Sequence, residues 1–288
     1  MASQRQLKGR IRSVKSTKQI TRAMQMVAAS KMRRAQEAVK ATSDYTQVAN
    51  ELLSYLASQG ATDDHPLFKS RAIKRRLLIV IASDKGLAGA YNSNVLKSYL
   101  GEVKADKQAG INTAIITVGR KVSQFSARLS GLSLLGTYDD LPENLEGSEF
   151  HSILAKAAEM YRSGEVDAVD LIYTRFVSSL KQVAATQRLL PAGFTETTVS
   201  DSVRSAQYEP SVEAVLDSVA YRLVGAQIFQ AMLDARASEH SMRMVAMKNA
   251  TDNASDLVDD LTLAMNKARQ AAITQELAEI SSGAEAMK

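Results

Sequence analysis

The sequence predicts an α/β protein in which two long terminal helices form an antiparallel coiled coil and a mostly parallel α/β domain lies between them in the chain. Two observations support this prediction. All four prolines and ten of the 14 glycines lie between residues 66 and 210, so both ends of the chain are nearly free of residues that interrupt helices. Between the ends, strand-like and helix-like segments alternate, which is typical of a parallel sheet with crossover helices.

The terminal helices are expected at residues 3–58 and 211–281. At 1.5 Å per residue they would be roughly 80 Å and roughly 105 Å long, more than an ordinary domain can cover. We therefore expect three segments along the chain. They are an N-terminal coiled-coil helix (1–60), a central α/β domain (75–195) and a C-terminal coiled-coil helix (208–288).

Both terminal segments carry a stripe of apolar or small residues. The C-terminal stripe alternates spacings of four and three residues, which is the coiled-coil period. It consists of His240, Met244, Met247, Thr251, Ala254, Val258, Leu261, Met265, Ala268 and Ala272. The N-terminal stripe is looser and consists of Ile11, Val14, Met24, Ala28, Met32, Ala35 and Val39. We expect antiparallel pairing, because the central segment joins the helices at one end; the alternative is two helices packed on the central domain.

The central segment contains five strand-like runs, at residues 77–82, 113–118, 132–137, 168–176 and 183–190. Helical patterns separate the first four runs, at about 92–107, 120–130 and 148–162. This alternation predicts a Rossmann-like, mostly parallel sheet with right-handed crossovers. The fifth run follows the fourth after a short gap, so we expect it to be an antiparallel hairpin partner at the edge of the sheet.

Composition limits the classes of function. The chain has 288 residues, is 45% hydrophobic and contains no cysteine, so disulfide and thiol chemistry are excluded. No apolar run reaches the ~18 residues of a membrane span. Residues 1–40 hold 11 Lys and Arg and one acid, whereas residues 211–288 hold seven bases and 11 acids. The two arms could therefore attract each other, or either could face a charged partner.

The stretch IVIASDKGLAGAYNSN, residues 79–94, is the best candidate for a nucleotide site. A strand, a loop with Gly86 and Gly89 and a helical pattern follow one another, as in phosphate-binding loops. However, the glycines are three residues apart, and neither the G-x-x-x-x-G-K-[ST] nor the G-x-G-x-x-G pattern is present. A tight turn is the better interpretation. No catalytic, cofactor-binding or metal-ligating constellation is recognised elsewhere, since the three histidines are scattered.

Two other classes of function stay open at this point. A basic coiled-coil tether could bind nucleic acid through phosphate contacts, although the N-terminal bases are not interleaved with aromatic residues. An enzyme with a flavodoxin-like nucleotide domain would bind nucleotide as an isolated chain.

Both arms resemble one known family. KSTKQITRAMQMVAASKMRRAQ, residues 15–36, resembles the N-terminal helix of the gamma subunit of the F-type ATP synthase, and residues 238–287 resemble the C-terminal helix of that family. The pattern [IV]-T-x-E-x-x-[DE]-x-x-x-G-A of the family is matched by Ile273, Thr274, Glu276, Glu279, Gly283 and Ala284. The loop SDKGLAG is also similar to a central turn of these subunits, so the resemblance spans essentially the whole chain.

The resemblance implies a non-catalytic rotor subunit that needs no cofactor. As the central stalk, it would couple ion flow (typically hydrogen ions) through the membrane c-ring to the conformational cycle of the catalytic beta subunits. The implied partners are the alpha, beta and epsilon subunits and the c-ring, with no nucleic acid and no small-molecule substrate. The implied location is peripheral, on the cytoplasmic face of the bacterial cell membrane.

The resemblance also implies two sets of interface residues. Contacts with the beta subunits are expected at Met24, Lys31, Arg33, Arg34, Arg269, Gln270, Thr274 and Glu276. Contacts of the foot with the c-ring and epsilon are expected at Tyr208 and Glu209.

Overall fold

The computed structural model describes residues 4–63, 65–129, 131–142, 148–193, 198–200, 203, 209 and 211–286, without the side chains of 41–47, 148–149 and 283–286. It contains two long helices, α1 (Gln4–Ser58) and α6 (Val212–Ala286), as the sequence predicts. Compact packing divides the chain into two units. We call residues 1–29 with 243–288 the paired-helix unit, and residues 30–242 the α/β unit.

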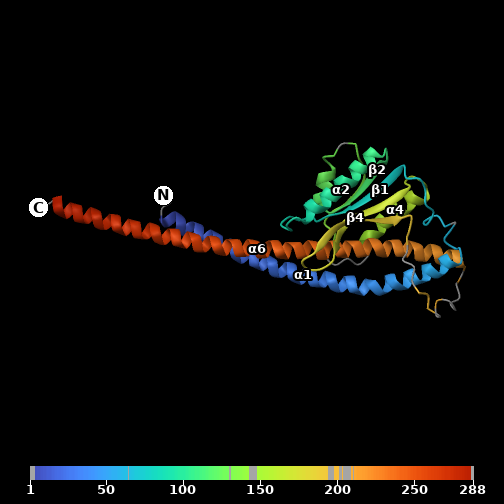
Figure 1. The fold of residues 1–288 in the computed structure, drawn as a ribbon, viewed down its shortest axis with the longest axis horizontal. Coiled ribbons are helices and arrows are strands. Elements are labelled where there is room, and N and C mark those ends of the chain that lie inside the picture. Colours follow the sequence, from blue (N-terminus) through green and yellow to red (C-terminus); the bar gives the residue numbers. More distant parts are fainter. Residues whose placement is uncertain are drawn as a thin grey trace. The chain divides into compact units, whose positions relative to one another are not determined.

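The α/β unit is built on one five-stranded sheet (Figure 1). Its strands are β1 (Arg75–Ile81), β2 (Asn112–Val118), β3 (Ser133–Tyr138), β4 (Ala168–Phe176) and β5 (Gln182–Leu190). The spatial order is β3-β2-β1-β4-β5, in which β5 is antiparallel to β4 and the other neighbours are parallel. The mostly parallel sheet and its antiparallel edge hairpin are therefore confirmed.

Helices cover both faces of this sheet (Figure 1). Alternate residues of a strand point to opposite faces, and β1 follows this rule. Leu78 and Val80 pack in a cluster with α2 (Tyr91–Gln108) and α3 (Arg120–Ser126). Leu77 and Ile79 pack in the larger cluster with α4 (Ser148–Arg162) and the first turns of α6. The strand is thus buried on both faces, which explains its continuous apolar sequence.

One glycine permits a close approach in this unit. Gly119 lies between β2 and α3 and has a left-handed φ of 99°. A Cβ at this position would lie 2.2 Å from the carbonyl oxygen of Ala82, which is closer than atoms can approach. The turn between β2 and α3 therefore requires glycine, because it passes directly against the end of β1.

In the paired-helix unit, α1 and α6 pack against each other in opposite directions. Lys18 donates from Nζ to Ser255 Oγ at 2.8 Å, and Thr251 Oγ1 donates to Thr21 Oγ1 at 2.8 Å. The partners on α6 therefore fall in number as those on α1 rise, which defines antiparallel pairing. An apolar cluster of Leu7, Ile11 and Leu261 lies nearer the chain ends. The predicted coiled coil is confirmed.

The seam differs from the prediction at three positions. Leu7 and Thr21 are buried although they were not assigned to the stripe, and Ala272 is exposed although it was assigned to it. The predicted apolar stripe on α6 runs to Ala272, but the apolar cluster between the two helices contains no residue of α6 after Ala268. Periodicity identifies the buried face of a helix but does not show where its partner begins.

Candidate functional surface on the paired helices

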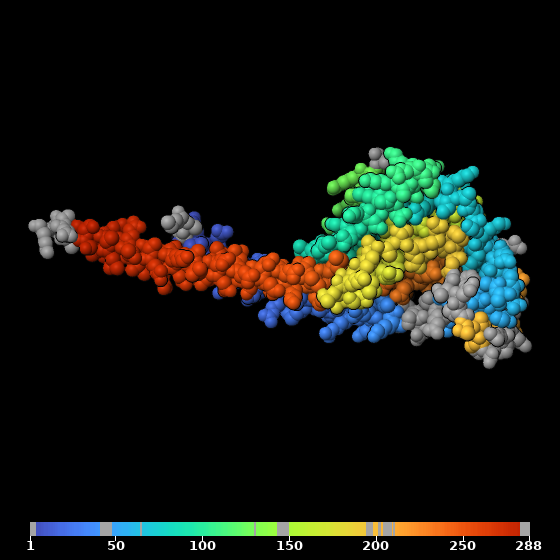
Figure 2. All heavy atoms as spheres, viewed as in Figure 1, coloured from blue at the N-terminus to red at the C-terminus, as the bar shows by residue number. Residues whose placement is uncertain are grey.

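The last turns of α6 form a bare surface in the paired-helix unit. Every side chain from residue 269 to residue 282 is exposed (Figure 2). Three large apolar side chains in this stretch, at spacings of four and three, are Ile273 (49% exposed), Leu277 (62%) and Ile280 (69%). These spacings place them on one face of the helix. An apolar helical stripe of this kind is normally buried, so this stretch has the character of a contact surface.

Four of the expected interface residues flank that stripe. By helical geometry, Arg269 and Glu276, seven residues apart, lie along one edge of it, and Gln270 and Thr274 lie along the other. Thr274 donates from Oγ1 to the carbonyl oxygen of Gln270 at 3.0 Å, and the charged groups stay exposed. The surface therefore has an apolar centre, one charged edge and one neutral polar edge.

The expected residues on α1 are less uniform. Met24, in the paired-helix unit, is half-buried. Lys31 is also half-buried, whereas Arg33 and Arg34 are exposed, and these three belong to the α/β unit. The structure brings the four α6 residues together but gives no comparable cluster for the α1 residues.

Of the two expected foot residues, Glu209 is exposed. Tyr208 lies outside the described residues. The foot therefore stays a prediction.

Side chains of the glycine loop after β1 make hydrogen bonds to other parts of the α/β unit. A carboxylate oxygen of Asp84 accepts from the backbone N–H of Arg120 at 2.9 Å and of Asp140 at 3.1 Å. Ser83 donates from Oγ to Asn92 Oδ1 at 2.9 Å. The carboxylate of Asp84 thus ties the loop after β1 to the segments that follow β2 and β3. The left-handed residues of the loop are Leu87 (φ 61°) and Gly89 (φ 56°).

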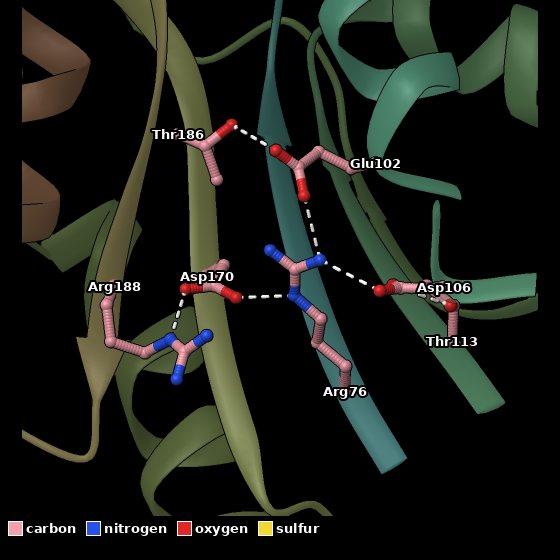
Figure 3. A network of polar contacts seen from close by, with 7 residues as sticks. All are labelled: Arg76, Glu102, Asp106, Thr113, Asp170, Thr186 and Arg188. Carbon is pink, nitrogen blue, oxygen red and sulfur yellow. Dashed lines mark hydrogen bonds and ion pairs between the residues drawn. The ribbon is translucent and has the colours of Figure 1, made fainter. Parts of the chain in front are cut away.

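The charged side chains around Arg76 in the α/β unit are also paired with one another by hydrogen bonds (Figure 3). The Arg76 guanidinium donates to Asp170, to Glu102 at 2.8 Å and to Asp106 at 2.9 Å. Arg188 donates from Nε to the second oxygen of Asp170 at 2.5 Å. Two further contacts complete the network, from Thr113 to Asp106 and from Thr186 to Glu102. Because each carboxylate already faces donors, the network fastens α2 to β1 and β5 and offers no open reactive group.

This network is absent from the expectations based on the sequence. A signal for it exists, since Arg76 and Asp170 are charged residues that adjoin the continuous apolar runs of β1 and β4. Burial raises the pKa of Asp234 on α6 to about 6, although Arg175 and Gln230 oppose the shift. That carboxyl lies on the buried side of α6, away from any constellation of nucleophiles or metal ligands in the described part of the chain.

Two further searches give negative results for the described residues. They contain no group of three or more His, Cys, Asp or Glu side chains placed to hold a metal ion. Within the same described ranges, no helix combines the length and the hydropathy that crossing a bilayer demands.

Comparison with known proteins identifies the family of this chain. A family model described as ATP synthase matches residues 3–287. The ATP synthase gamma chain of Acidithiobacillus ferrooxidans is 41% identical over 292 residues, and that of Stenotrophomonas maltophilia is 39% identical over 288 residues. Both alignments cover 100% of this chain and 100% of the relative. The chain belongs to the ATP synthase gamma chain family.

Solved structures agree with this assignment. This gamma chain is similar to a chain of the Tetrahymena thermophila mitochondrial ATP synthase central stalk and c-ring, with 27% identity, a TM-score of 0.57 and coverage of 80% of this chain and 99% of that chain. It also shares its fold with a chain of the Euglena gracilis mitochondrial ATP synthase, with 20% identity, a TM-score of 0.69 and coverage of 99% and 94%.

A gamma chain is the central-stalk subunit of the F-type ATP synthase and not its catalytic subunit. The resemblance found in the sequence is therefore confirmed. The comparisons give no support to the alternative of a nucleic-acid-binding tether.

Proposed function

We propose that this gamma chain is the rotating shaft that couples ion flow through a membrane c-ring to the conformational cycle of the catalytic beta subunits. The observation that carries the proposal is the bare end of α6. Its apolar stripe of Ile273, Leu277 and Ile280 has no cover within the described chain, and residues 269–282 are all exposed. A ring of subunits around the shaft would cover this stripe and remove the cost of its exposure to water.

The uneven flanks of the stripe support a role in rotation. Arg269 and Glu276 on one edge and Gln270 and Thr274 on the other give the helix chemically different sides. When such a helix turns inside a ring, each surrounding beta subunit meets a different side in turn. A subunit changes conformation only if the contacts differ between its states, and an asymmetric shaft supplies that difference.

The remaining contacts follow from the same role. We propose that Met24, Lys31, Arg33 and Arg34 on α1 also meet the beta subunits, and that Tyr208 and Glu209 belong to the foot that meets epsilon and the c-ring. The alpha subunits complete the ring. The chain would then be peripheral, on the cytoplasmic face of the bacterial cell membrane. The three segments 1–60, 75–195 and 208–288 are proposed as the shaft arm, the docking domain and the second shaft arm.

Reconstituted vesicles that hold the complete ATP synthase provide the test. Met24→Lys adds a charge to a half-buried contact that must slide, so we expect ATP synthesis to fall while the complex still assembles. Met24→Leu keeps the apolar contact and serves as the matched control. Equal synthesis by both variants would remove Met24 from the interface.

A second variant addresses α6. Glu276→Lys reverses the charge on the charged edge, so we expect weaker torque in single-molecule rotation under load. Normal rotation would remove Glu276 from the interface. Failure of alpha, beta and epsilon subunits to co-purify with this chain would refute the proposed function as a whole.

A further inference from the structure

The segment that leads from α1 into β1 contains a turn at residues 65–69. Two backbone N–H groups of the turn donate to the carbonyl oxygen of His65, at 3.0 and 3.2 Å. Leu67 is 1% exposed and packs in the larger apolar cluster of the sheet. Its carbonyl oxygen accepts from the N–H of Ala192, just after β5, at 2.6 Å. The turn is therefore fastened to the core and to the end of one strand.

Phe68, in the same turn, lies where two apolar clusters of the α/β unit meet. It packs against the larger cluster of the sheet. It also packs against a second cluster, in which Leu53 and Leu56 of α1 contact Leu216 of α6. All of these residues belong to the α/β unit. The position of this turn therefore decides how firmly the end of α1 is joined to the sheet.

The imidazole of His65 uses both of its ring nitrogens. Nδ1 accepts the backbone N–H of Leu67, two residues further on, at 3.3 Å, which is the hydrogen bond of an Asx turn. A backbone N–H can only donate, so Nδ1 carries no proton and the neutral ring has its proton on Nε2. Nε2 donates to Asp217 Oδ1 on α6 at 3.2 Å. The neutral ring thus fastens its own turn through one nitrogen and α6 through the other.

Protonation of His65 breaks the first of these two contacts. A proton on Nδ1 turns the acceptor into a donor that faces the N–H of Leu67. The charged groups that face the ring are Asp217 from α6 and Arg162 from α4. Asp217 Oδ1 already accepts from Arg162 at 2.5 Å, so it compensates an imidazolium only in part. Burial of the ring lowers the pKa of His65 below its ordinary value of 6.5; Asp217 opposes this shift and Arg162 adds to it.

We propose that His65 is a proton-operated latch, in which the neutral ring fastens the turn at residues 65–69 to α6 and protonation of Nδ1 releases the turn. Release loosens the joint at Phe68 between the end of α1 and the sheet. The inference goes beyond the shaft role, because a shaft needs no titrating group at this joint.

Hydrogen exchange of the gamma chain in the assembled ATP synthase tests the proposal. The parent and His65→Asn are compared at pH 7.5, 6.5 and 5.5, since Asn also accepts an N–H in an Asx turn but does not titrate. The released turn binds a proton more tightly than the fastened turn, so release becomes easier as the pH falls below about 6.5. We expect the amides of residues 67–69 to exchange faster in the parent than in the variant, by up to about tenfold for each pH unit below 6.5.

His151→Asn is the matched control, because it removes an exposed imidazole from α4 in the same unit. We expect this variant to keep the pH response of the parent at residues 67–69. An equal pH response in the parent and in His65→Asn would overturn the inference, and so would loss of the response in His151→Asn. Neither result bears on the shaft role, which concerns contacts with other subunits.

A second measurement uses the unchanged ring of His65, so it does not depend on whether His65→Asn folds. Nitrogen-15 NMR of the full-length gamma chain with labelled histidine distinguishes the two neutral tautomers. The chain has three histidines, and the signal of His65 is the one that both His151→Asn and His240→Asn retain. We expect the Nε2–H tautomer at pH 7.5 and a gain of the second proton at Nδ1 as the pH falls below 6.5. An Nδ1–H tautomer at pH 7.5 would overturn the inference.

Discussion

The two units of this gamma chain are stabilised in different ways. In the α/β unit, Leu77, Leu78, Ile79 and Val80 are each 0% exposed, and helices cover both faces of their strand. In the paired-helix unit, the apolar cluster of the seam retains some exposure, with Leu7 at 7%, Ile11 at 9% and Leu261 at 8%, and residues 269–282 of α6 are all exposed. The α/β unit contains its own complete core, whereas the paired helices have a narrow seam and an outer surface suited to partners.

The comparison also extends to polar groups. The α/β unit buries a charged network around Arg76, whereas among the described residues of the paired-helix unit the buried polar side chains are those of Thr21 and Thr251. Buried charged side chains that are hydrogen-bonded to one another hold the helix and strands of the core in fixed positions. Hydroxyl groups interact weakly and allow the helices to approach closely. Four variants test how far this contrast holds.

The largest effect is expected from Arg76→Ala. This change leaves Asp106 and Asp170 buried without their main cation, and breaking a buried ion pair in this way costs about 3–5 kcal/mol. Urea unfolding followed by tyrosine fluorescence measures it, since the chain has nine Tyr and no Trp. Arg128→Ala, at an exposed position, is the control and should change stability little. A loss below about 1 kcal/mol would mean that the network contributes little.

Asp234→Asn should stabilise the α/β unit, and the effect depends on pH. Burial raises the folded-state pKa to about 6 from an ordinary value of 3.8, so the folded state binds the proton more tightly than the unfolded state. The stability that Asp234 contributes is therefore complete at low pH and is lost as the pH rises from about 4 to about 6.

The asparagine variant should be more stable than the parent at pH 7.5 by up to about 3 kcal/mol and nearly equal to it at pH 4. Urea midpoints at both pH values measure the difference. The same difference at pH 4 and pH 7.5 would contradict the assignment.

Leu261→Ala tests the seam of the paired helices. Leu261 packs in a cluster with Leu7 and Ile11, and truncation of such a residue costs about 2 kcal/mol at the low end of core values. We expect hydrogen exchange in residues 5–15 to accelerate roughly 30-fold. Leu263→Ala is the control, because Leu263 is 57% exposed, and it should leave exchange unchanged. Equal effects of the two changes would argue against this seam.

The smallest effect is expected from replacing both hydroxyl groups of the seam. Thr21→Val with Thr251→Val removes the hydrogen bond between the two side chains but leaves no unpaired partner. Replacing both partners by groups of similar shape is nearly neutral, so we expect a change within about 1 kcal/mol. Helical circular dichroism during heating provides the measurement. A loss above about 2 kcal/mol would show that this pair matters as much as the apolar seam does.

The sequence by itself determined the elements and their pairing. Residues 4–58 and 212–286 are helical, as their few glycines and lack of prolines predicted. Their apolar stripes predicted that they pair, and the central segment that joins them at one end predicted the antiparallel direction. Strand β4 was predicted at its observed limits, Ala168–Phe176. These features depend on periodicity and on residues close together in the chain, so the local sequence is enough to predict them. The interface residues proposed on α6 rest on resemblance to a family and not on such patterns.

Only the tertiary structure decided which polar groups meet. Arg76, Asp106 and Asp170 lie far apart in the chain, and only the sheet order that places β1 between β2 and β4 brings them together. Asp84 closes the glycine loop because β2 and β3 end beside it, which no local pattern shows. His65 likewise meets Asp217 only once the turn after α1 lies beside the first turns of α6. Contacts between distant segments depend on topology, and topology depends on how all the elements pack together.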